Sequence, residues 1–116
     1  MEIWNEEVFG PVLSVMTFRD EEEGIQLANS NRFGLGGAIF SEDEEQQRRV
    51  ARGLECGIVW INCSQPCFSE LPWGGQKESG IGRDLGEEGL ASFLEPKQIV
   101  QPTTNEPLGW YIPSKL

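Results

Sequence analysis

The feature that most constrains the fold is an alternation of short apolar runs with polar, helix-like segments. Residues 12–18, 34–40 and 58–62 are rich in apolar residues, β-branched residues or glycine, which predicts three strands. The segments between them have the pattern of short helices. Because β-α-β units pair their strands in parallel through right-handed crossovers, this order predicts a β-α-β-α-β layer of an α/β fold.

Three pairs of polar residues mark the expected helix starts. A Ser or Asp followed three residues later by Glu forms a capping box, which satisfies free backbone amides at a helix N-terminus. The pairs are Asp20 with Glu23, Ser41 with Glu44, and Asp84 with Glu87. We expect the first helix to end near residues 29–31, the second near Leu54 and the third near Leu94.

The rest of the chain does not complete such a layer. Residues 63–83 are a long segment rich in Gly, Pro, Ser and Trp, and residues 97–101 alternate like a strand at a sheet edge. A parallel sheet is covered on both faces, and two crossover helices are too few for that. Apolar residues near the N-terminus, such as Trp4 and Phe9, have nothing to cover them. We therefore expect an incomplete fold, a piece of a larger domain.

Charge and residue usage exclude several classes of function. The 116 residues include 19 acidic and 9 basic ones, a formal net charge of −10, which argues against nucleic-acid and anionic-membrane partners. No run of 18 apolar residues is present, so no membrane-spanning helix is expected. The lack of histidine excludes imidazole bases and His-containing zinc sites within the chain, and three cysteines are too few for a four-thiolate site.

Two glycine-rich segments do not fit nucleotide-binding loops. Residues 80–86 are spaced one residue too long for the dinucleotide fingerprint and follow a loop instead of a strand. Residues 74–79 lack the spacing of a Walker loop. Cys63 and Cys67 lie four apart without further ligands, which favours small packing residues over a metal pair.

Two aromatic-containing segments admit both a structural and a functional interpretation. In residues 6–12, two carboxylates and an aromatic precede a Gly-Pro turn, which is typical of an anchored loop. The same carboxylate can instead accept hydrogen bonds from a ribose diol, beside a ring that packs on a cofactor. Phe68 and Trp73 are either core residues or a wall that contacts a cationic ligand through cation–π interactions.

Four ordered motifs identify a family. They are EEVFGPV at residues 6–12, FGLGGA at 33–38, GIVWIN at 57–62 and PWGGQKESGIGRDLG at 72–86. Together they resemble the C-terminal quarter of the aldehyde dehydrogenase superfamily. The run SQPCFSELPW at residues 64–73 resembles the plant betaine-aldehyde and aminoaldehyde dehydrogenases. The resemblance covers almost the whole chain and places Met1 inside the family's sequence.

The resemblance implies an architecture and an address. Residues 1–95 would be the C-terminal part of the catalytic α/β domain with its following helix, and residues 96–112 would hold an oligomerisation strand and a tail. Family members are dimers or tetramers, so other copies of the subunit are the implied partner. Residues 113–116 contain Ser114, Lys115 and Leu116. At a free C-terminus these three residues form a peroxisomal targeting signal, which an import receptor recognises. The expected location is the peroxisome, with the cytoplasm as the alternative.

The resemblance also implies NAD-dependent oxidation of an aldehyde to a carboxylate. In this family a cysteine thiolate attacks the carbonyl, a hydride passes to the nicotinamide, and a glutamate-activated water hydrolyses the thioester. Glu7 would bind the nicotinamide ribose hydroxyls, and Phe9 would pack near the nicotinamide. The family's nucleophile, general base and oxyanion asparagine belong to segments upstream of this chain, so no catalytic residue is expected here.

The resemblance implies three residues at the substrate pocket. Trp73 would form part of an aromatic box around the substrate's amino or trimethylammonium head, and Cys67 would lie near the pocket mouth without a catalytic role. A bulky Ile58 would crowd a trimethylammonium group. The resemblance therefore favours ω-aminoaldehydes over betaine aldehyde, by about 1–3 kcal/mol.

Two hypotheses for the function remain open at this point. One is the C-terminal portion of an NAD-dependent dehydrogenase that oxidises ω-aminoaldehydes or betaine aldehyde. The other is a truncated, non-catalytic protein that docks into full-length subunits through its terminal strand. Because the nucleophile is expected elsewhere, the isolated chain is expected to be inactive under both.

Overall fold

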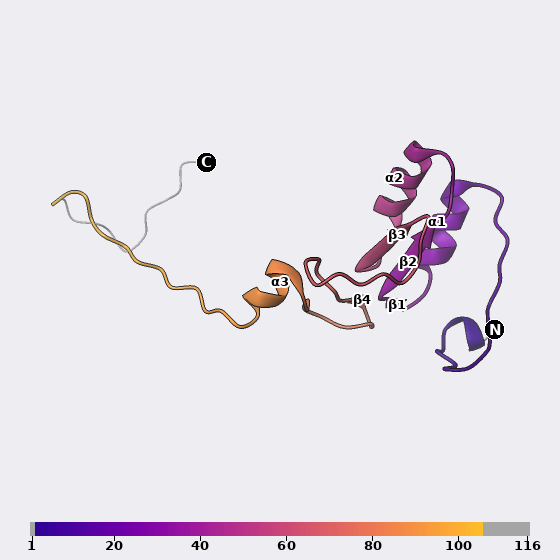
Figure 1. Cartoon of the computed structure of the whole chain (residues 1–116), viewed down its shortest axis with the longest axis horizontal. Coiled ribbons are helices and arrows are strands. Elements are labelled where there is room, and N and C mark those ends of the chain that lie inside the picture. Colours follow the sequence, from indigo (N-terminus) through magenta and orange to yellow (C-terminus); the bar gives the residue numbers. More distant parts are fainter. Residues whose placement is uncertain (1, 106–116) are drawn as a thin grey trace.

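The computed structural model describes residues 2–105 and shows an α/β body that continues into an extended C-terminal segment (Figure 1). The elements in chain order are η1 (Glu2–Trp4), α1 (Glu21–Asn29), β1 (Phe33–Gly34), β2 (Gly36–Ile39), α2 (Glu44–Gly53), β3 (Ile58–Ile61), β4 (Gln76–Lys77) and α3 (Gly86–Ala91). Helices α1 and α2 lie with the strands at one end, and the chain beyond α3 leads away from them (Figure 1).

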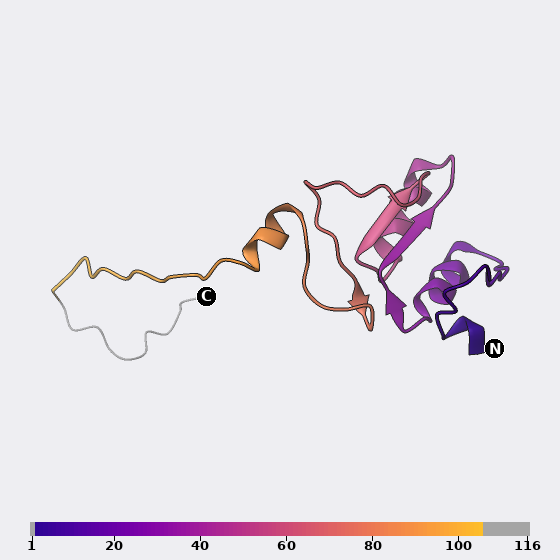
Figure 2. The same ribbon diagram turned by 60° about the horizontal axis from the view of Figure 1, so that its bottom comes forward.

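The parallel pair of β2 and β3 forms the centre of the body. Gly36 pairs with Ile58 at one end and Ile39 with Ile61 at the other, and α2 connects the two strands (Figure 2). The predicted parallel crossover is therefore confirmed. A second, antiparallel pair joins β1 to β4 through Phe33 and Lys77. The sequence pattern did not predict this pair, because residues 63–83 were expected to be a loop.

The first two helix starts agree with the sequence only in part. At α1, the Asp20 side chain accepts a hydrogen bond from the Glu23 amide at 2.9 Å, as predicted. At α2, the prediction of Ser41 as the cap is wrong, because Asp43 accepts from the amides of Glu45 and Gln46. The Ser41 hydroxyl is already engaged, since it donates to Gln46 Oε1 at 2.6 Å and accepts from the Asp43 amide.

The predicted start of the third helix, a capping box of Asp84 with Glu87, is also wrong. Helix α3 follows Leu85, which has a φ of 61° and makes no side-chain cap. Asp84 lies outside the helix, where its backbone pairs with that of Trp73 in an isolated antiparallel bridge. Leu85 occupies the N-cap position, so Asp84 lies one residue too early to cap the helix. Helix α3 ends at Ala91, before the predicted limit at Leu94.

Two predicted strands, at residues 12–18 and 97–101, are absent from the part of the chain that the structure describes. Both segments are irregular and exposed, with Leu13 84% and Ile99 85% accessible to solvent. A strand needs a neighbouring strand to bond its amides and carbonyls, and within residues 2–105 neither segment has one. The layer thus has two parallel strands where three were expected, and the fold is incomplete.

Little of the described chain is enclosed. Within residues 2–105 no apolar side chain is fully buried, and the buried positions are Gly34, Gly75 and Gly89. Helices α1 and α2 are held together by Arg49, which donates to both carboxylate oxygens of Glu21 at 2.9 and 3.0 Å. No helix in the described range is long and apolar enough to cross a bilayer. Most of the apolar surface therefore remains available to other chain segments.

Candidate functional site

Two open hollows flank the strands of the body. The first, the N-terminal hollow, encloses about 780 Å³ and is lined by the N-terminal segment together with β1, β2 and the turn after β4. The second, the tryptophan hollow, encloses about 390 Å³ between β3 and residues 63–73. Glu7 and Phe9 both line the N-terminal hollow, whereas Ile58, Cys67 and Trp73 all line the tryptophan hollow. The structure thus groups the predicted site residues into the same two sets as the sequence.

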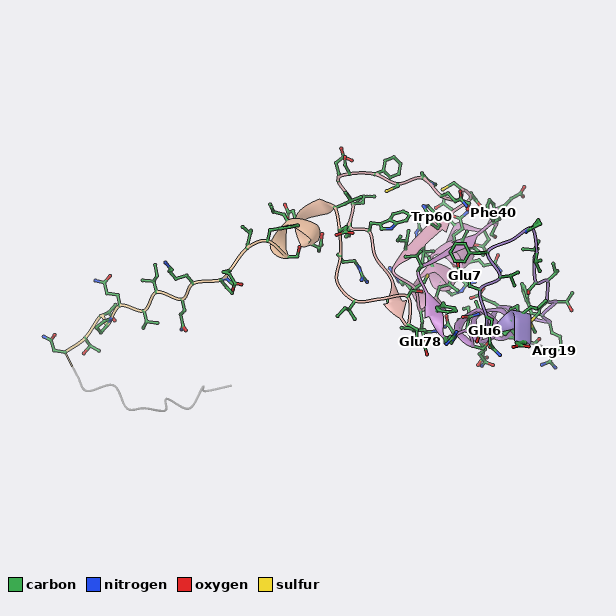
Figure 3. The ribbon with its side chains drawn as sticks, turned by 90° about the horizontal axis from the view of Figure 1, so that it is seen from below. Glu6, Glu7, Arg19, Phe40, Trp60 and Glu78 are labelled. Atoms are coloured by element: carbon green, nitrogen blue, oxygen red, sulfur yellow. The ribbon has the colours of Figure 1, made fainter. Side chains whose placement is uncertain are left out.

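The adjacent carboxylates of Glu6 and Glu7 have different environments. Glu6 Oε2 accepts a hydrogen bond from Arg32 Nη2 at 3.0 Å. No side chain among residues 2–105 bonds the carboxylate of Glu7, which is exposed at the N-terminal hollow (Figure 3). Of the two glutamates in the motif, Glu7 is therefore the one whose oxygens are available to a ligand.

Phe9 stands on a turn that presents its ring to solvent. Its φ of 48° lies in the left-handed region, which is uncommon for a bulky residue, and the residue is 91% exposed. The following Gly-Pro turn is closed by the Val12 amide, which donates to the Gly10 carbonyl at 2.7 Å. Such an exposed aromatic ring can pack on one face of a flat ligand ring.

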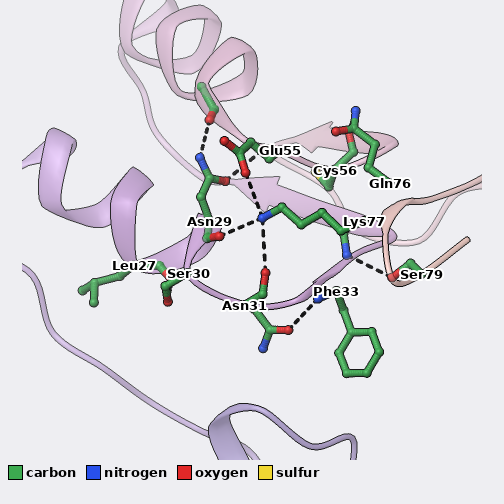
Figure 4. Close-up of polar contacts among 12 residues, drawn as sticks. Leu27, Asn29, Ser30, Asn31, Phe33, Glu55, Cys56, Gln76, Lys77 and Ser79 are labelled. Carbon is green, nitrogen blue, oxygen red and sulfur yellow. Dashed lines mark hydrogen bonds and ion pairs between the residues drawn. The ribbon is translucent and has the colours of Figure 1, made fainter.

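Polar contacts around Lys77 hold the other wall of the N-terminal hollow in place. Lys77 Nζ donates to the carbonyls of Asn29 and Asn31 at 2.7 and 3.2 Å, and lies 2.9 Å from Glu55 Oε2 (Figure 4). A cation suits this position, since the Asn29 carbonyl is at the C-terminal end of α1. The Ser79 hydroxyl in turn accepts from the Gly34 amide at 2.9 Å. These contacts attach the turn after β4 to the body.

Two tryptophans shape the tryptophan hollow. The ring centroids of Trp60 and Trp73 lie 6.2 Å apart with the planes inclined by 55°. Trp60 Nε1 also donates to the Pro66 carbonyl at 3.0 Å, which ties the loop to β3. The backbone of Trp73 is held by its antiparallel bridge to Asp84. Ile58 projects from β3 into the same hollow, so it can limit the room beside the Trp73 ring.

Trp60 is a site residue that the sequence interpretation missed. It lies two residues after Ile58 on the same strand, and side chains at that spacing share one face. This period could have placed Trp60 beside Ile58. Phe68, which the sequence offered as a possible wall with Trp73, also lines the tryptophan hollow.

The three cysteines differ in their burial and contacts. Burial raises the pKa of the Cys56 thiol above its ordinary value, and its Sγ donates to the Ile58 carbonyl at 3.1 Å. Cys63 and Cys67 are exposed, and both are free. No group of His, Cys, Asp or Glu side chains within the described residues has the arrangement of a metal site. The predicted address, Ser114, Lys115 and Leu116, lies outside the described residues.

Comparisons with known proteins identify the family of the chain. The sequence profile of the aldehyde dehydrogenase family matches residues 1–99. The chain is 58% identical over 111 residues to a chloroplastic aminoaldehyde dehydrogenase of Arabidopsis thaliana, covering 96% of this chain and 22% of the relative. It is 56% identical to the peroxisomal aminoaldehyde dehydrogenase 2 of Malus domestica, over 100% of this chain and 23% of the relative.

A solved structure shows the same fold. The betaine aldehyde dehydrogenase of Staphylococcus aureus, crystallised in complex with NAD+, superposes with a TM-score of 0.85 at 50% identity, over 96% of this chain and 22% of that chain. The chain thus spans about a fifth of the length of the relatives that it matches. With the family profile matching most of its length, the chain belongs to the aldehyde dehydrogenase family.

Proposed function

We propose that this chain forms part of an NAD-dependent dehydrogenase that oxidises ω-aminoaldehydes or betaine aldehyde to the carboxylate. The relatives with these activities in their names support the substrate class, and the neighbour crystallised with NAD+ supports the coenzyme. The chain would contribute the walls that hold coenzyme and substrate. A segment outside these 116 residues would contribute the nucleophile, because burial raises the pKa of the Cys56 thiol and neither Cys63 nor Cys67 contacts a base among the described residues.

The observation that carries the proposal is the contrast between Glu6 and Glu7. Arg32 donates to the Glu6 carboxylate, whereas no side chain among residues 2–105 pairs with the oxygens of Glu7 at the hollow that Phe9 also lines. A ribose diol offers two hydroxyl donors, and an ionised carboxylate is an acceptor for both. The residues present therefore fit the nicotinamide ribose, with the Phe9 ring free to pack on the nicotinamide.

The chain's residues would have distinct roles in this reaction. NAD supplies the hydride acceptor when bound. Glu7 would hold the ribose hydroxyls and so orient the attached ring toward the aldehyde. Trp73, supported by Trp60, would face the cationic end of the substrate, where a ring attracts an ammonium group. Ile58 would set the room available to that group, and Cys67 would line the entrance.

The location and assembly remain proposals. Ser114, Lys115 and Leu116 would direct the protein to the peroxisome through its import receptor, and the Malus domestica relative is peroxisomal by name whereas that of Arabidopsis thaliana is chloroplastic. Deleting these three residues from a fluorescent fusion should abolish punctate peroxisomal signal; unchanged puncta would refute the address. Residues 96–112 would join subunits, which would supply the neighbouring strand that residues 97–101 lack here.

The test of the coenzyme role uses a graft. In it, this chain replaces the aligned region of the Arabidopsis thaliana relative, so that the missing four-fifths of the enzyme is present. Glu7→Gln should raise the dissociation constant of NADH, followed by nicotinamide fluorescence, about tenfold or more, since a charged acceptor is lost. Glu42→Gln, an exposed glutamate that lines neither hollow, is the matched control. Equal NADH binding by both variants would contradict the proposal.

A further inference from the structure

We infer that Arg32 is a positioning residue, which sets the place of Glu7 by tying the N-terminal segment to the turn after β4. The inference rests on the proposed coenzyme role of Glu7. Arg32 lies directly before β1, and it contacts two segments that are far from it in sequence. Nothing in the sequence pattern pairs it with either.

The guanidinium of Arg32 uses three of its nitrogens on these two segments. Nη2 donates to Glu6 Oε2 at 3.0 Å, and Nε donates to the Asn5 carbonyl at 3.1 Å. Nη1 donates to Glu78 Oε2 at 2.9 Å. The guanidinium carbon also lies 4.7 Å from the centroid of the Phe33 ring, which supports it from one side. Glu6, directly before Glu7, is thereby held by its side chain, and Asn5 is held by its backbone carbonyl.

The geometry of the contacts favours arginine over lysine at this position. A guanidinium is a planar fork with donors in several directions, whereas an ammonium is a single point of charge. Only the fork can reach both carboxylates and the carbonyl in one conformation. Without a cation here, Glu6 and Glu78 would be two like charges on neighbouring segments, and their repulsion would separate the N-terminal segment from the turn.

The ion pairs of Arg32 are moderate in strength, because the Arg32 side chain is 42% exposed and those of Glu6 and Glu78 are more exposed still. Solvent screening keeps such pairs weak individually. A second contact would remain without them, since Asn31 Nδ2 donates to the Trp4 carbonyl at 2.7 Å. Loss of Arg32 should therefore loosen the Glu7 segment without unfolding the body.

The experiment compares Arg32→Met with Arg48→Met in the same graft. Arg48 makes one exposed ion pair, with Glu44 at 3.0 Å, and lines neither hollow, so it controls for loss of an arginine. We expect Arg32→Met to raise the NADH dissociation constant about fivefold and to speed amide hydrogen exchange in residues 5–9. The KM for the aldehyde should stay unchanged, because the tryptophan hollow does not contact Arg32. Arg32→Lys should restore part of the binding.

The outcomes separate this inference from the proposed function. NADH binding and amide exchange equal to those of Arg48→Met would overturn the role of Arg32. If the Arg32→Met graft does not fold, the double variant Glu6→Gln with Glu78→Gln decides by the same criteria, since it removes both ion pairs and the repulsion together. If Glu7→Gln leaves NADH binding intact, the coenzyme proposal fails, while amide exchange in residues 5–9 still tests the tie.

Discussion

Trp60 lies on strand β3 and Trp73 at the far end of the loop that follows it, and their rings pack at a centroid distance of 6.2 Å and an inclination of 55°. Tilted aromatic pairs at this separation are favourable beyond their buried area. The indole N–H of Trp60 also holds the loop through the Pro66 carbonyl. The wall that would face the substrate is therefore positioned by a residue of β3.

This relationship gives a first prediction for the graft. Trp60→Phe keeps a ring beside Trp73 but removes the hydrogen bond to Pro66, so the loop should become less fixed. The KM for 3-aminopropionaldehyde should rise about threefold, in line with loss of one hydrogen bond. Steady-state kinetics should show the KM for NAD unchanged. A rise in both constants would mean that Trp60 supports the whole fold and not this wall.

The second prediction concerns the room beside Trp73. Ile58→Ala in the graft should improve kcat/KM for betaine aldehyde relative to 3-aminopropionaldehyde about tenfold, because a larger head group then fits. Ile39→Ala, on the neighbouring strand β2, removes the same atoms from a position that lines neither hollow. The two substrates are compared in parallel assays. An unchanged preference in Ile58→Ala would remove this residue from the specificity argument.

The third prediction follows from the cysteine environments. Burial raises the pKa of the Cys56 thiol above its ordinary value, so near neutral pH little of this thiol is ionised, and its burial also limits access by a reagent. Iodoacetamide at about pH 7.5 should modify Cys63 and Cys67 first, as located by peptide mass spectrometry. The rate of Cys56 modification should increase at alkaline pH, where its thiolate forms. Fast labelling of Cys56 at neutral pH would identify it as an activated thiol, contrary to this account.

The sequence pattern predicted those features that depend on residues close together in the chain. The Asp20 cap and the parallel pairing of β2 with β3 depend on neighbouring residues or on one short crossover, and both are confirmed. At Ser41 the pattern failed, because one hydroxyl can satisfy either the backbone or Gln46, and spacing alone does not decide between them. The missing strand at residues 12–18 depends on a partner strand, which residues 2–105 do not supply.

The candidate site residues were assigned from the family motifs more than from physical reasoning, and their roles stay predictions. Glu7 and Trp73 were each open to a structural interpretation until the motifs resembled a known family. The contacts that position them could not be predicted, since Arg32 with Glu78 and Trp60 with Trp73 join residues that only the folded chain brings together. The antiparallel pair of β1 and β4, which brings Glu78 close to Arg32, depends on the same long-range closure.

The central claim is that these 116 residues form coenzyme and substrate walls but hold no nucleophile. NADH formation from 3-aminopropionaldehyde, measured for the isolated chain and for the graft under the same conditions, tests it most directly. The account predicts no turnover by the isolated chain, and NAD-dependent oxidation by the graft close to the rate of the Arabidopsis thaliana enzyme. Turnover by the isolated chain, or a folded graft that binds neither NADH nor aldehyde, would contradict it.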